Sequence, residues 1–224
     1  DDDDDGERDD GDARAGDPGC ATTTSPAWGR GLAREPRVAR LRPGLGRRHA
    51  LPPGRKLILS AAVWMPLKGQ LSMVRALRRL IGLGYAVDLV LAGNQHQFPG
   101  YADLVLAEIA ASGLQAHVHC LGHIAPELLA ELMSAADVFC LASNREGWPN
   151  VVHEAQACGL PSVSTDVGGI PDMLPGPSYG IIVPVDDQTA LEGALAHALD
   201  TAWDREAIVR WGRSRSWEIG RAHV

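Results

Sequence analysis

Residues 137–172 read DVFCLASNREGWPNVVHEAQACGLPSVSTDVGGIPD, and this stretch decides the fold. The apolar run 137–142 has the length and composition of a fully buried β-strand. A glycine-containing loop follows, and then Pro149 and Asn150 offer a proline for a first helical turn and an asparagine that can cap it. Helical spacing continues over residues 151–158, where a Gly-Leu-Pro sequence stops it. The stretch therefore predicts a strand, a loop and a helix in succession.

The predicted helix begins at the carboxyl end of a buried strand, where free backbone N–H groups and the helix dipole favour an anion. Glu146 lies in the loop and Glu154 lies about one turn into the helix. A carboxylate in that turn gains roughly 0.3–1 kcal/mol from the dipole, which is the simplest explanation of Glu154. The two carboxylates can also accept hydrogen bonds from hydroxyls while the amides face phosphates. A nucleotide sugar has this arrangement of groups.

Outward from this stretch, apolar runs alternate with helical patterns over most of the chain. The runs expected to form strands are 57–63, 86–92, 116–121, 137–141, 162–164 and 180–183. The segments expected to form helices are 70–83, 101–112, 126–135, 150–158, 189–200 and 204–213. This alternation predicts an α/β fold with a Rossmann-like parallel sheet and helices on both faces. Ligands of such sheets bind outside the carboxyl ends of the strands.

The pair Glu146-x7-Glu154 is embedded in Glu-Gly-Trp-Pro-Asn and is followed by Glu-Ala-x-Ala-Cys-Gly-Leu-Pro and Asp-Val-Gly-Gly-Ile-Pro-Asp. This whole pattern closely resembles the donor-binding domain of family 4 glycosyltransferases, and the resemblance covers residues 55–217. Members of that family are retaining, metal-independent enzymes of the two-domain GT-B fold. The resemblance implies the C-terminal half of such an enzyme, which transfers a sugar from a nucleoside-diphosphate sugar to a glycan or lipid-linked acceptor.

The resemblance also implies roles for individual residues. Glu146 and Lys68 would be catalytic, Glu146 by holding the sugar and Lys68 by facing the diphosphate, and Glu154 would bind the ribose hydroxyls. The other donor-binding positions that it implies are Gly93, His123, Ile124, Gly147, Trp148, Pro149, Asn150 and Val151. No metal and no cofactor besides the donor substrate is expected. The sequence departs from the family at Val63, where an arginine would share the phosphates with the lysine.

Simpler explanations stand beside several of these assignments. Lys68 precedes a predicted helix and is either a point charge for a diphosphate or an ordinary surface lysine. Trp148 either stacks on the sugar or covers the apolar side of its loop. Gly93 fits a close approach to a ligand or a tight turn, whereas Gly168 and Gly169 fit turn packing first.

His117 and His119 point to one face of a predicted strand, and they are expected to be a structural pair because no further metal ligands accompany them. Cys120, Cys140 and Cys158 are expected to be small buried hydrophobic residues. The cysteine spacing has no zinc or redox motif, which fits a reducing compartment. We therefore expect a cytoplasmic protein, with peripheral membrane contact at the inner face in the full-length parent.

The 224 residues carry a net charge of −7 and are 45% hydrophobic, values that allow one globular domain and a tail. Most of the negative charge lies in residues 1–20, a run typical of a disordered tail. Residues 21–54 are rich in arginine, proline and glycine without interleaved aromatics, which indicates a linker and no nucleic-acid partner. Residues 218–224 resemble the translation of a sequencing adapter and are expected to be non-native.

The sequence thus predicts the donor domain of a retaining glycosyltransferase, inactive alone, whose partners are a nucleotide sugar and a missing N-terminal acceptor-binding domain. Two alternatives stay open. One is an isomerase of the nucleotide-sugar 2-epimerase type, which has the same fold, and the other is a non-catalytic module that binds nucleotide sugars. The sequence does not specify the sugar, the base, the acceptor or the linkage.

Overall fold

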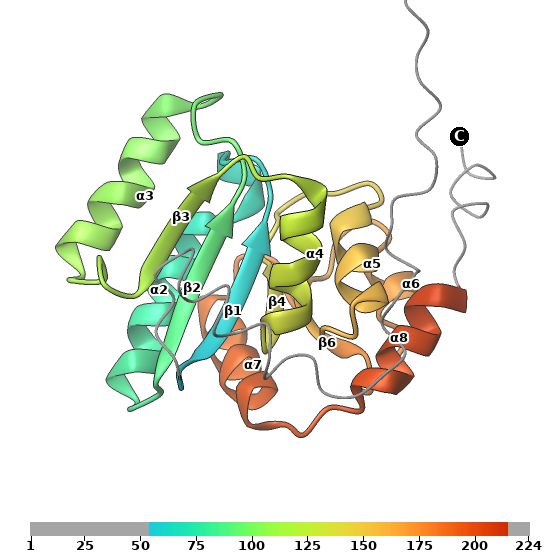
Figure 1. The fold of residues 1–224 in the computed structure, drawn as a ribbon. Helices are drawn as coiled ribbons and strands as arrows, with labels where there is room; N and C mark the ends of the chain where they lie inside the picture. Colours follow the sequence, from blue (N-terminus) through green and yellow to red (C-terminus); the bar gives the residue numbers. More distant parts are fainter. Residues whose placement is uncertain (1–53, 215–224) are drawn as a thin grey trace, which may run out of the picture.

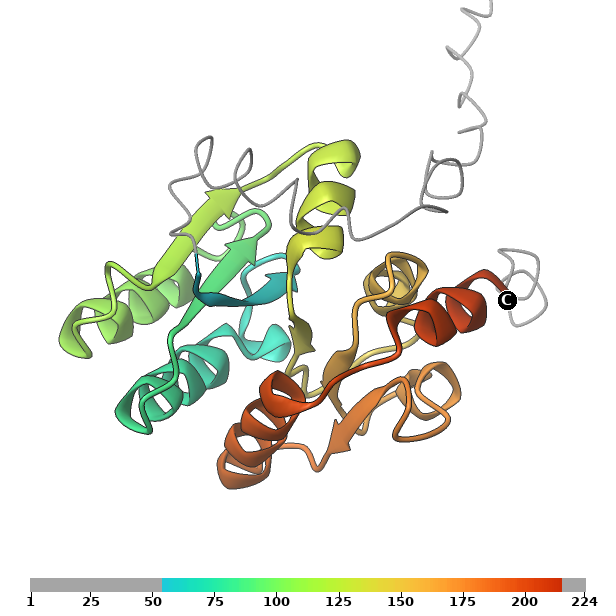
Figure 2. The ribbon, with the colours of Figure 1, turned by 60° about the horizontal axis from the view of Figure 1, so that its bottom comes forward.

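The computed structural model describes residues 54–214, which form a parallel sheet with helices on both faces (Figures 1 and 2). The strands are β1 (Lys56–Ala61), β2 (Val87–Ala92), β3 (Val118–Gly122), β4 (Val138–Leu141), β5 (Ser162–Thr165) and β6 (Gly180–Val183). The helices are η2 (Pro66–Lys68), α2 (Gln70–Gly82), α3 (Pro99–Ala111), α4 (Pro126–Ala135), α5 (Asn150–Ala157), α6 (Ile170–Met173), α7 (Gln188–Asp200) and α8 (Arg205–Ser214). The predicted α/β fold is confirmed. The expected tail, the linker, Cys20 and the C-terminal segment lie outside the described residues.

The order of the strands is β3-β2-β1-β4-β5-β6, and every neighbouring pair is parallel. β1 pairs with β2 along its whole length, whereas its register with β4 covers only Ile58↔Val138 and Leu59↔Phe139. The chain winds in one direction from β1 to β3 and in the other direction from β4 to β6. The β1/β4 boundary is therefore the switch point of a doubly wound sheet, where a crevice forms outside the strand ends.

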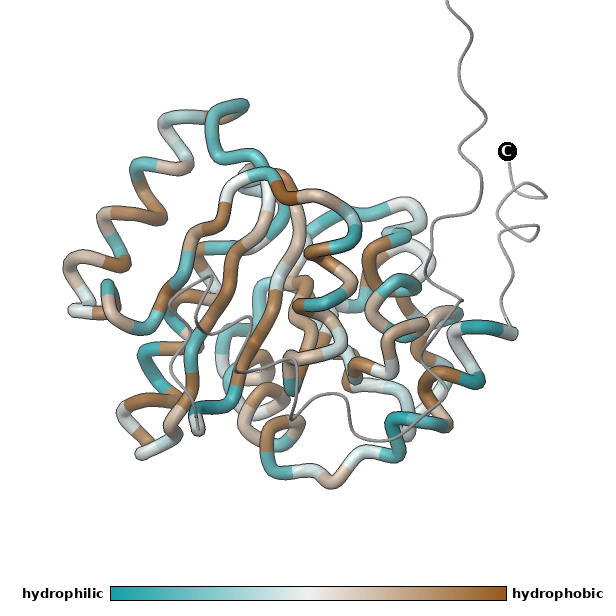
Figure 3. Tube along the Cα trace, viewed as in Figure 1, coloured by the Kyte–Doolittle hydropathy of each residue, from teal (hydrophilic) through white to brown (hydrophobic). Residues whose placement is uncertain are grey.

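Two apolar layers enclose the sheet. Helices α2, α3 and α7 pack on one face, where Ile58 and Leu89 point, and α4, α5 and α6 pack on the other face, where Leu59 and Phe139 point. Strands β2 and β4 are buried at every position and are apolar along most of their length, as strands covered on both faces are (Figure 3). α8 packs against α5 and closes the second layer. None of the helices between residues 54 and 214 has the length and apolar character needed to cross a bilayer.

Several element boundaries differ from the prediction. β1 ends at Ala61 because its ladder with β2 ends at the pair Ala61↔Ala92, and beyond it the Trp64 N–H donates to the Asn94 carbonyl in the loop after β2, at 2.9 Å. α3 starts at Pro99, two residues early, because proline fits the first helical position. The short helices η2 and α6 were not predicted.

The cysteine prediction is wrong for Cys120 and confirmed for the other two described cysteines. Cys120 is exposed because β3 is an edge strand with cover on fewer sides. Cys140 and Cys158 are buried, and burial raises the pKa of Cys140 to about 12 and that of Cys158 to about 11. The two buried thiols therefore behave as small hydrophobic side chains.

At the amino edge of the sheet, the buried carboxylate of Asp88 lies among three basic side chains. Its oxygens lie 2.7 Å from Arg55 Nε, 3.1 Å from His117 Nδ1 and 3.3 Å from His119 Nε2. Burial alone raises the pKa of Asp88, but the hydrogen bonds from His119 and His117 and the charge of Arg55 outweigh it, so the pKa lies below its usual value. The two histidines are thus a structural pair, as predicted. Within residues 54–214 no group of three His, Cys, Asp or Glu side chains is arranged to hold a metal ion.

Asp88→Asn removes a charge on which these three side chains converge, and we expect it to lower the free energy of unfolding by about 2–3 kcal/mol at neutral pH. Because the folded pKa of Asp88 is depressed, its contribution is complete above the unfolded pKa and is lost as the pH falls through the folded pKa. The stability gap between the wild type and the variant should therefore narrow in acid. Urea denaturation over a pH series measures it. Asp103→Asn, an exposed carboxylate of α3, is the control, and equal stability of Asp88→Asn and the wild type at neutral pH would contradict the assignment.

Candidate functional site

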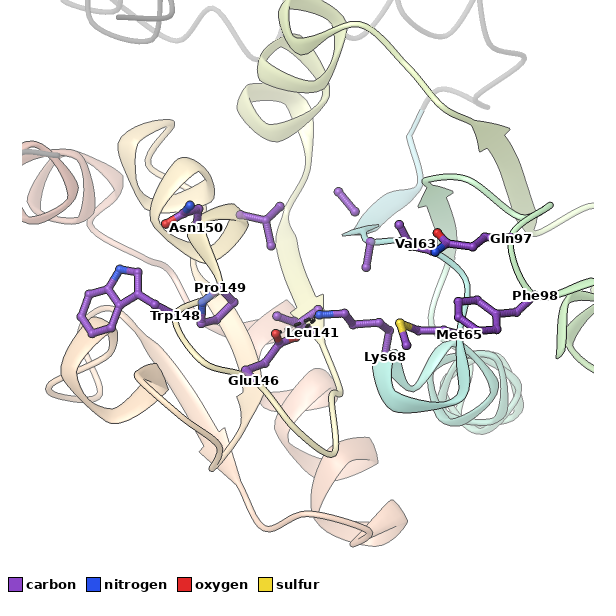
Figure 4. A pocket seen from close by; sticks show the side chains of 13 residues that line it. Val63, Met65, Lys68, Gln97, Phe98, Leu141, Glu146, Trp148, Pro149 and Asn150 are labelled. Carbon is purple, nitrogen blue, oxygen red and sulfur yellow. Dashed lines mark hydrogen bonds and ion pairs between the residues drawn. The ribbon is translucent and has the colours of Figure 1, made fainter. Parts of the chain in front are cut away.

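A pocket of about 460 Å³ lies outside the carboxyl ends of β1 and β4, at the switch point (Figure 4). The loops after β1, β2 and β4 supply its walls. Its lining residues are Ala61, Ala62, Val63, Met65, Lys68, Gln97, Phe98, Leu141, Glu146, Trp148, Pro149, Asn150 and Val151. The pocket therefore occupies the place where open α/β sheets bind their ligands.

Two backbone contacts hold the loop after β1 against the loop after β4. Gly69 adopts φ +70°, and a Cβ at this position would lie 2.0 Å from the carbonyl oxygen of Ala142, so only glycine fits. The N–H of Asn144 donates to the carbonyl of Leu67 at 2.9 Å. These contacts fix the distance across the crevice and bring Lys68 close to Glu146.

Lys68 and Glu146 point toward one another across the floor of the pocket (Figure 4). The Lys68 ammonium donates to both Glu146 oxygens, at 2.7 and 2.8 Å, and the Ser143 hydroxyl donates to Glu146 Oε1 at 2.6 Å. The Glu146 side chain is 8% exposed and that of Lys68 24%. The structure thus brings the two predicted catalytic residues into a partly buried ion pair, so Lys68 is not an ordinary surface lysine.

The amino end of α5 faces the same pocket. Pro149 is the N-cap residue and Asn150 is the first helical residue, so the prediction that Asn150 caps the helix is wrong. Within the described part of the chain no side chain caps this helix, and its first turn contains no acidic residue. The amide groups of Asn150 and Val151 are therefore placed to bind an anion in the pocket.

Glu154 lies one turn further along α5, on the helix side that carries Asn150. It is half-buried, and burial raises the pKa of its carboxyl group. Among residues 54–214 its side chain has no hydrogen-bond or ion-pair partner. A half-buried carboxylate without a protein partner is costly, and hydroxyl groups of a ligand would compensate it.

Trp148 packs on a glycine-rich turn. A Cβ on Gly169 would lie 2.2 Å from Cε3 of the indole, and a Cβ on Gly168 would lie 2.4 Å from the carbonyl oxygen of Gly147. The indole is 39% exposed and points away from the Lys68–Glu146 pair (Figure 4). The predicted packing role of the two glycines is confirmed, because Gly169 lies under the Trp148 ring and Gly168 lies against the backbone of Glu146 and Gly147.

Glu154 and the remaining predicted donor-binding residues lie along the same edge of the sheet but outside the pocket lining. Gly93 has φ +137° and donates its N–H to the Gly122 carbonyl at 2.7 Å, and a Cβ there would lie 1.9 Å from the Ala62 carbonyl oxygen, so its backbone packs closely against the segments that end β1 and β3. His123 and Ile124 follow β3, two strands away from β1. Gly147 lies between the lining residues Glu146 and Trp148.

Besides Ala61, Ala62 and Leu141 at the strand ends, sequence reasoning missed four loop residues of the site, which are Met65, Gln97, Phe98 and Ser143. Each follows the carboxyl end of β1, β2 or β4. Because parallel strands deliver all these ends to one edge, their position in the sequence was the available signal. Residue type gave no signal, since all four have uncharged side chains.

Fold and site together define a doubly wound α/β domain that has a pocket lined by charged side chains at its switch point. The sequence profile of the family described as "Glycosyl transferases group 1" matches residues 45–215, and the chain belongs to this family. It is 29% identical over 167 residues to the GDP-mannose-dependent monoacylated alpha-(1-6)-phosphatidylinositol monomannoside mannosyltransferase of Corynebacterium glutamicum, a match that covers 69% of this chain and 42% of the relative.

Two solved structures have a similar fold. Sucrose-phosphate synthase of Thermosynechococcus elongatus superposes with a TM-score of 0.69 at 27% identity, over 85% of this chain and 50% of that one. Anabaena Alr3699/HepE in complex with UDP superposes with a TM-score of 0.66 at 22% identity, over 85% of this chain and 48% of that one. The chain spans less than half the length of the curated relatives that it matches.

Gly69→Ala should push the two loops of the pocket apart, because the added Cβ meets backbone atoms and the positive φ is strained for alanine. We expect a loss of about 2–3 kcal/mol in the free energy of unfolding, measured by urea denaturation. Gly82→Ala is the matched control, since a Cβ in that helical position meets nothing within 4 Å. If both variants were as stable as the wild type, the contact between the loops would not be a constraint.

Proposed function

We propose that this domain is the donor-binding half of a retaining glycosyltransferase and that its switch-point pocket binds a nucleoside-diphosphate sugar. The observation that carries the proposal is the convergence of Lys68, Glu146 and the uncapped amino end of α5 on one pocket. A diphosphate needs positive potential, and a sugar needs hydrogen-bond acceptors for its hydroxyls. In this pocket, Lys68 and the helix terminus supply the positive potential, and Glu146 supplies the acceptors.

In the proposed complex the diphosphate lies against the amides of Asn150 and Val151 and the ammonium of Lys68. Transfer of the sugar leaves negative charge on the β-phosphate, and these groups stabilise it. Glu146 accepts hydrogen bonds from sugar hydroxyls and orients the anomeric carbon for attack with retention. Glu154 accepts hydrogen bonds from the ribose hydroxyls. Val63 lines the pocket without a charge, so Lys68 and the helix supply the positive potential.

The ligand class agrees with what the relatives' names state. The Corynebacterium relative is named as GDP-mannose-dependent, and Alr3699/HepE was solved with UDP. GDP-mannose and UDP both contain a nucleoside diphosphate, but their bases differ. The proposal therefore names a nucleoside-diphosphate sugar as the ligand and leaves the base to experiment. No metal takes part in the proposed mechanism.

The full reaction also needs an acceptor site. We propose that an N-terminal domain, which the longer relatives have the length to contain, supplies it and covers the exposed Leu67 and Phe98 beside the pocket. The acceptor would be a glycan or a lipid-linked glycan, and a lipid-linked acceptor would bring the whole enzyme to the inner face of the membrane. The described domain alone is then expected to bind the donor without turnover.

Glu154→Ala should weaken binding of a nucleoside diphosphate ten- to a hundredfold, because hydrogen bonds to a charged carboxylate are worth about 1.5–3 kcal/mol. Calorimetric titration of the chain with UDP, GDP, UDP-glucose and GDP-mannose measures it and names the base. Glu206→Ala is the control, since that carboxylate is exposed on α8. Unchanged affinity in Glu154→Ala would remove the ribose role, and absence of binding to the folded wild type would contradict the proposed function.

The donor affinity should also depend on pH. Burial raises the pKa of Glu154 in the free protein, and ribose hydroxyls favour the charged carboxylate. Affinity should therefore be complete above the raised pKa and should fall as the pH decreases through it, over the range where the protein stays folded. The same titrations on Glu154→Gln should show a flatter profile, and equal profiles for both proteins would contradict the prediction.

A further inference from the structure

The carboxylate of Glu146 has two partners with different mobility. Lys68 holds both of its oxygens, at 2.7 and 2.8 Å, and Ser143 holds Oε1 at 2.6 Å. With a side chain only 8% exposed, Glu146 has little access to water that could replace a lost partner. Its position in the pocket therefore depends on these two groups.

Lys68 is the partner that a diphosphate would attract. Its ammonium stands on a flexible four-carbon stem, and the side chain is 24% exposed and lines the pocket. A diphosphate at the amino end of α5 carries more negative charge than one carboxylate, so the ammonium turns toward it. Glu146 then loses some or all of its contact with Lys68 at the moment when the sugar arrives.

Ser143 is the partner of Glu146 whose position is fixed by the surrounding structure. It is fully buried, and its carbonyl accepts a hydrogen bond from the Thr165 hydroxyl of β5. The next residue, Asn144, is tied through its N–H to the Leu67 carbonyl at 2.9 Å. The serine is thus fixed between β5 and the loop after β1, and its short side chain keeps the hydroxyl directed at Glu146.

We propose that Ser143 is a positioning residue, which holds the Glu146 carboxylate in place for the sugar hydroxyls after Lys68 has turned to the diphosphate. The inference rests on the proposed function and adds a residue to it. Ser143 contributes to recognition of the sugar and not of the nucleotide, because it acts only through Glu146. Its removal should therefore change the affinity for a nucleotide sugar relative to that for the matching nucleoside diphosphate.

The test compares two dissociation constants on the same protein by calorimetry, for UDP and UDP-glucose or for GDP and GDP-mannose, whichever pair binds. For Ser143→Ala we expect about tenfold weaker binding of the nucleotide sugar and unchanged binding of the nucleoside diphosphate. Ser143→Cys keeps the size with a weaker donor and should change the ratio in the same direction by less. The cysteine variant also tests the proposal if the alanine variant does not fold.

Ser164→Ala is the matched control. Ser164 is an equally buried serine on the neighbouring strand β5, and within residues 54–214 its hydroxyl has no hydrogen-bond partner. A second control repeats Ser143→Ala in a Glu146→Gln background, where its effect on the ratio should become small. A purely structural role for Ser143 would weaken both ligands equally, and that result, or no change, would overturn the proposal. If the folded wild type bound neither pair, the proposed function would fail together with the inference.

Discussion

The contact between Gly69 and the backbone of Ala142 is the constraint on which the site depends. β1 and β4 are neighbours, but the chain leaves them for helices on opposite faces, so their loops diverge and open a crevice. The missing side chain of Gly69 lets the two loops touch at the mouth of this crevice. Lys68 and Glu146 are 78 positions apart in the chain, and they meet because this contact sets the width of the gap.

The two edges of the sheet differ in how well their charged groups are satisfied. At the amino edge, the carboxylate of Asp88 is surrounded by Arg55 and two histidines, and the result is stability. At the carboxyl edge, α5 begins without a side-chain cap, and Glu154 has no hydrogen-bond or ion-pair partner among the described residues. A charged group with protein partners has a structural role within the fold, whereas a charged or polar group without one is a candidate for contact with a ligand. The charged groups at the carboxyl edge therefore have more capacity left for a ligand than those at the amino edge.

The sequence predicted the order and type of the long elements because each has a strong local signal. α4 matches its predicted bounds because Pro126 starts it, and β6 matches because its apolar run is short and isolated. The errors have tertiary causes. The end of β1 depends on pairing with β2, and the exposure of Cys120 depends on β3 being an edge strand. Glu146 and Lys68 could be named from the motif, but their pairing and the hydroxyl of Ser143 could not, because both depend on how the loops close.

The ion pair between Lys68 and Glu146 bears on the selectivity of the pocket. A ligand that carries only phosphates would take Lys68 and leave Glu146 with a single partner, and a free sugar would have to compete with an ammonium for Glu146. The second exchange leaves the partly buried Lys68 ammonium without its carboxylate, which is costly. A ligand with a diphosphate and hydroxyls on adjacent atoms compensates both charges at once. Under the proposed function, the pocket's preference for a nucleotide sugar over its separate parts follows from the pairing of these two side chains.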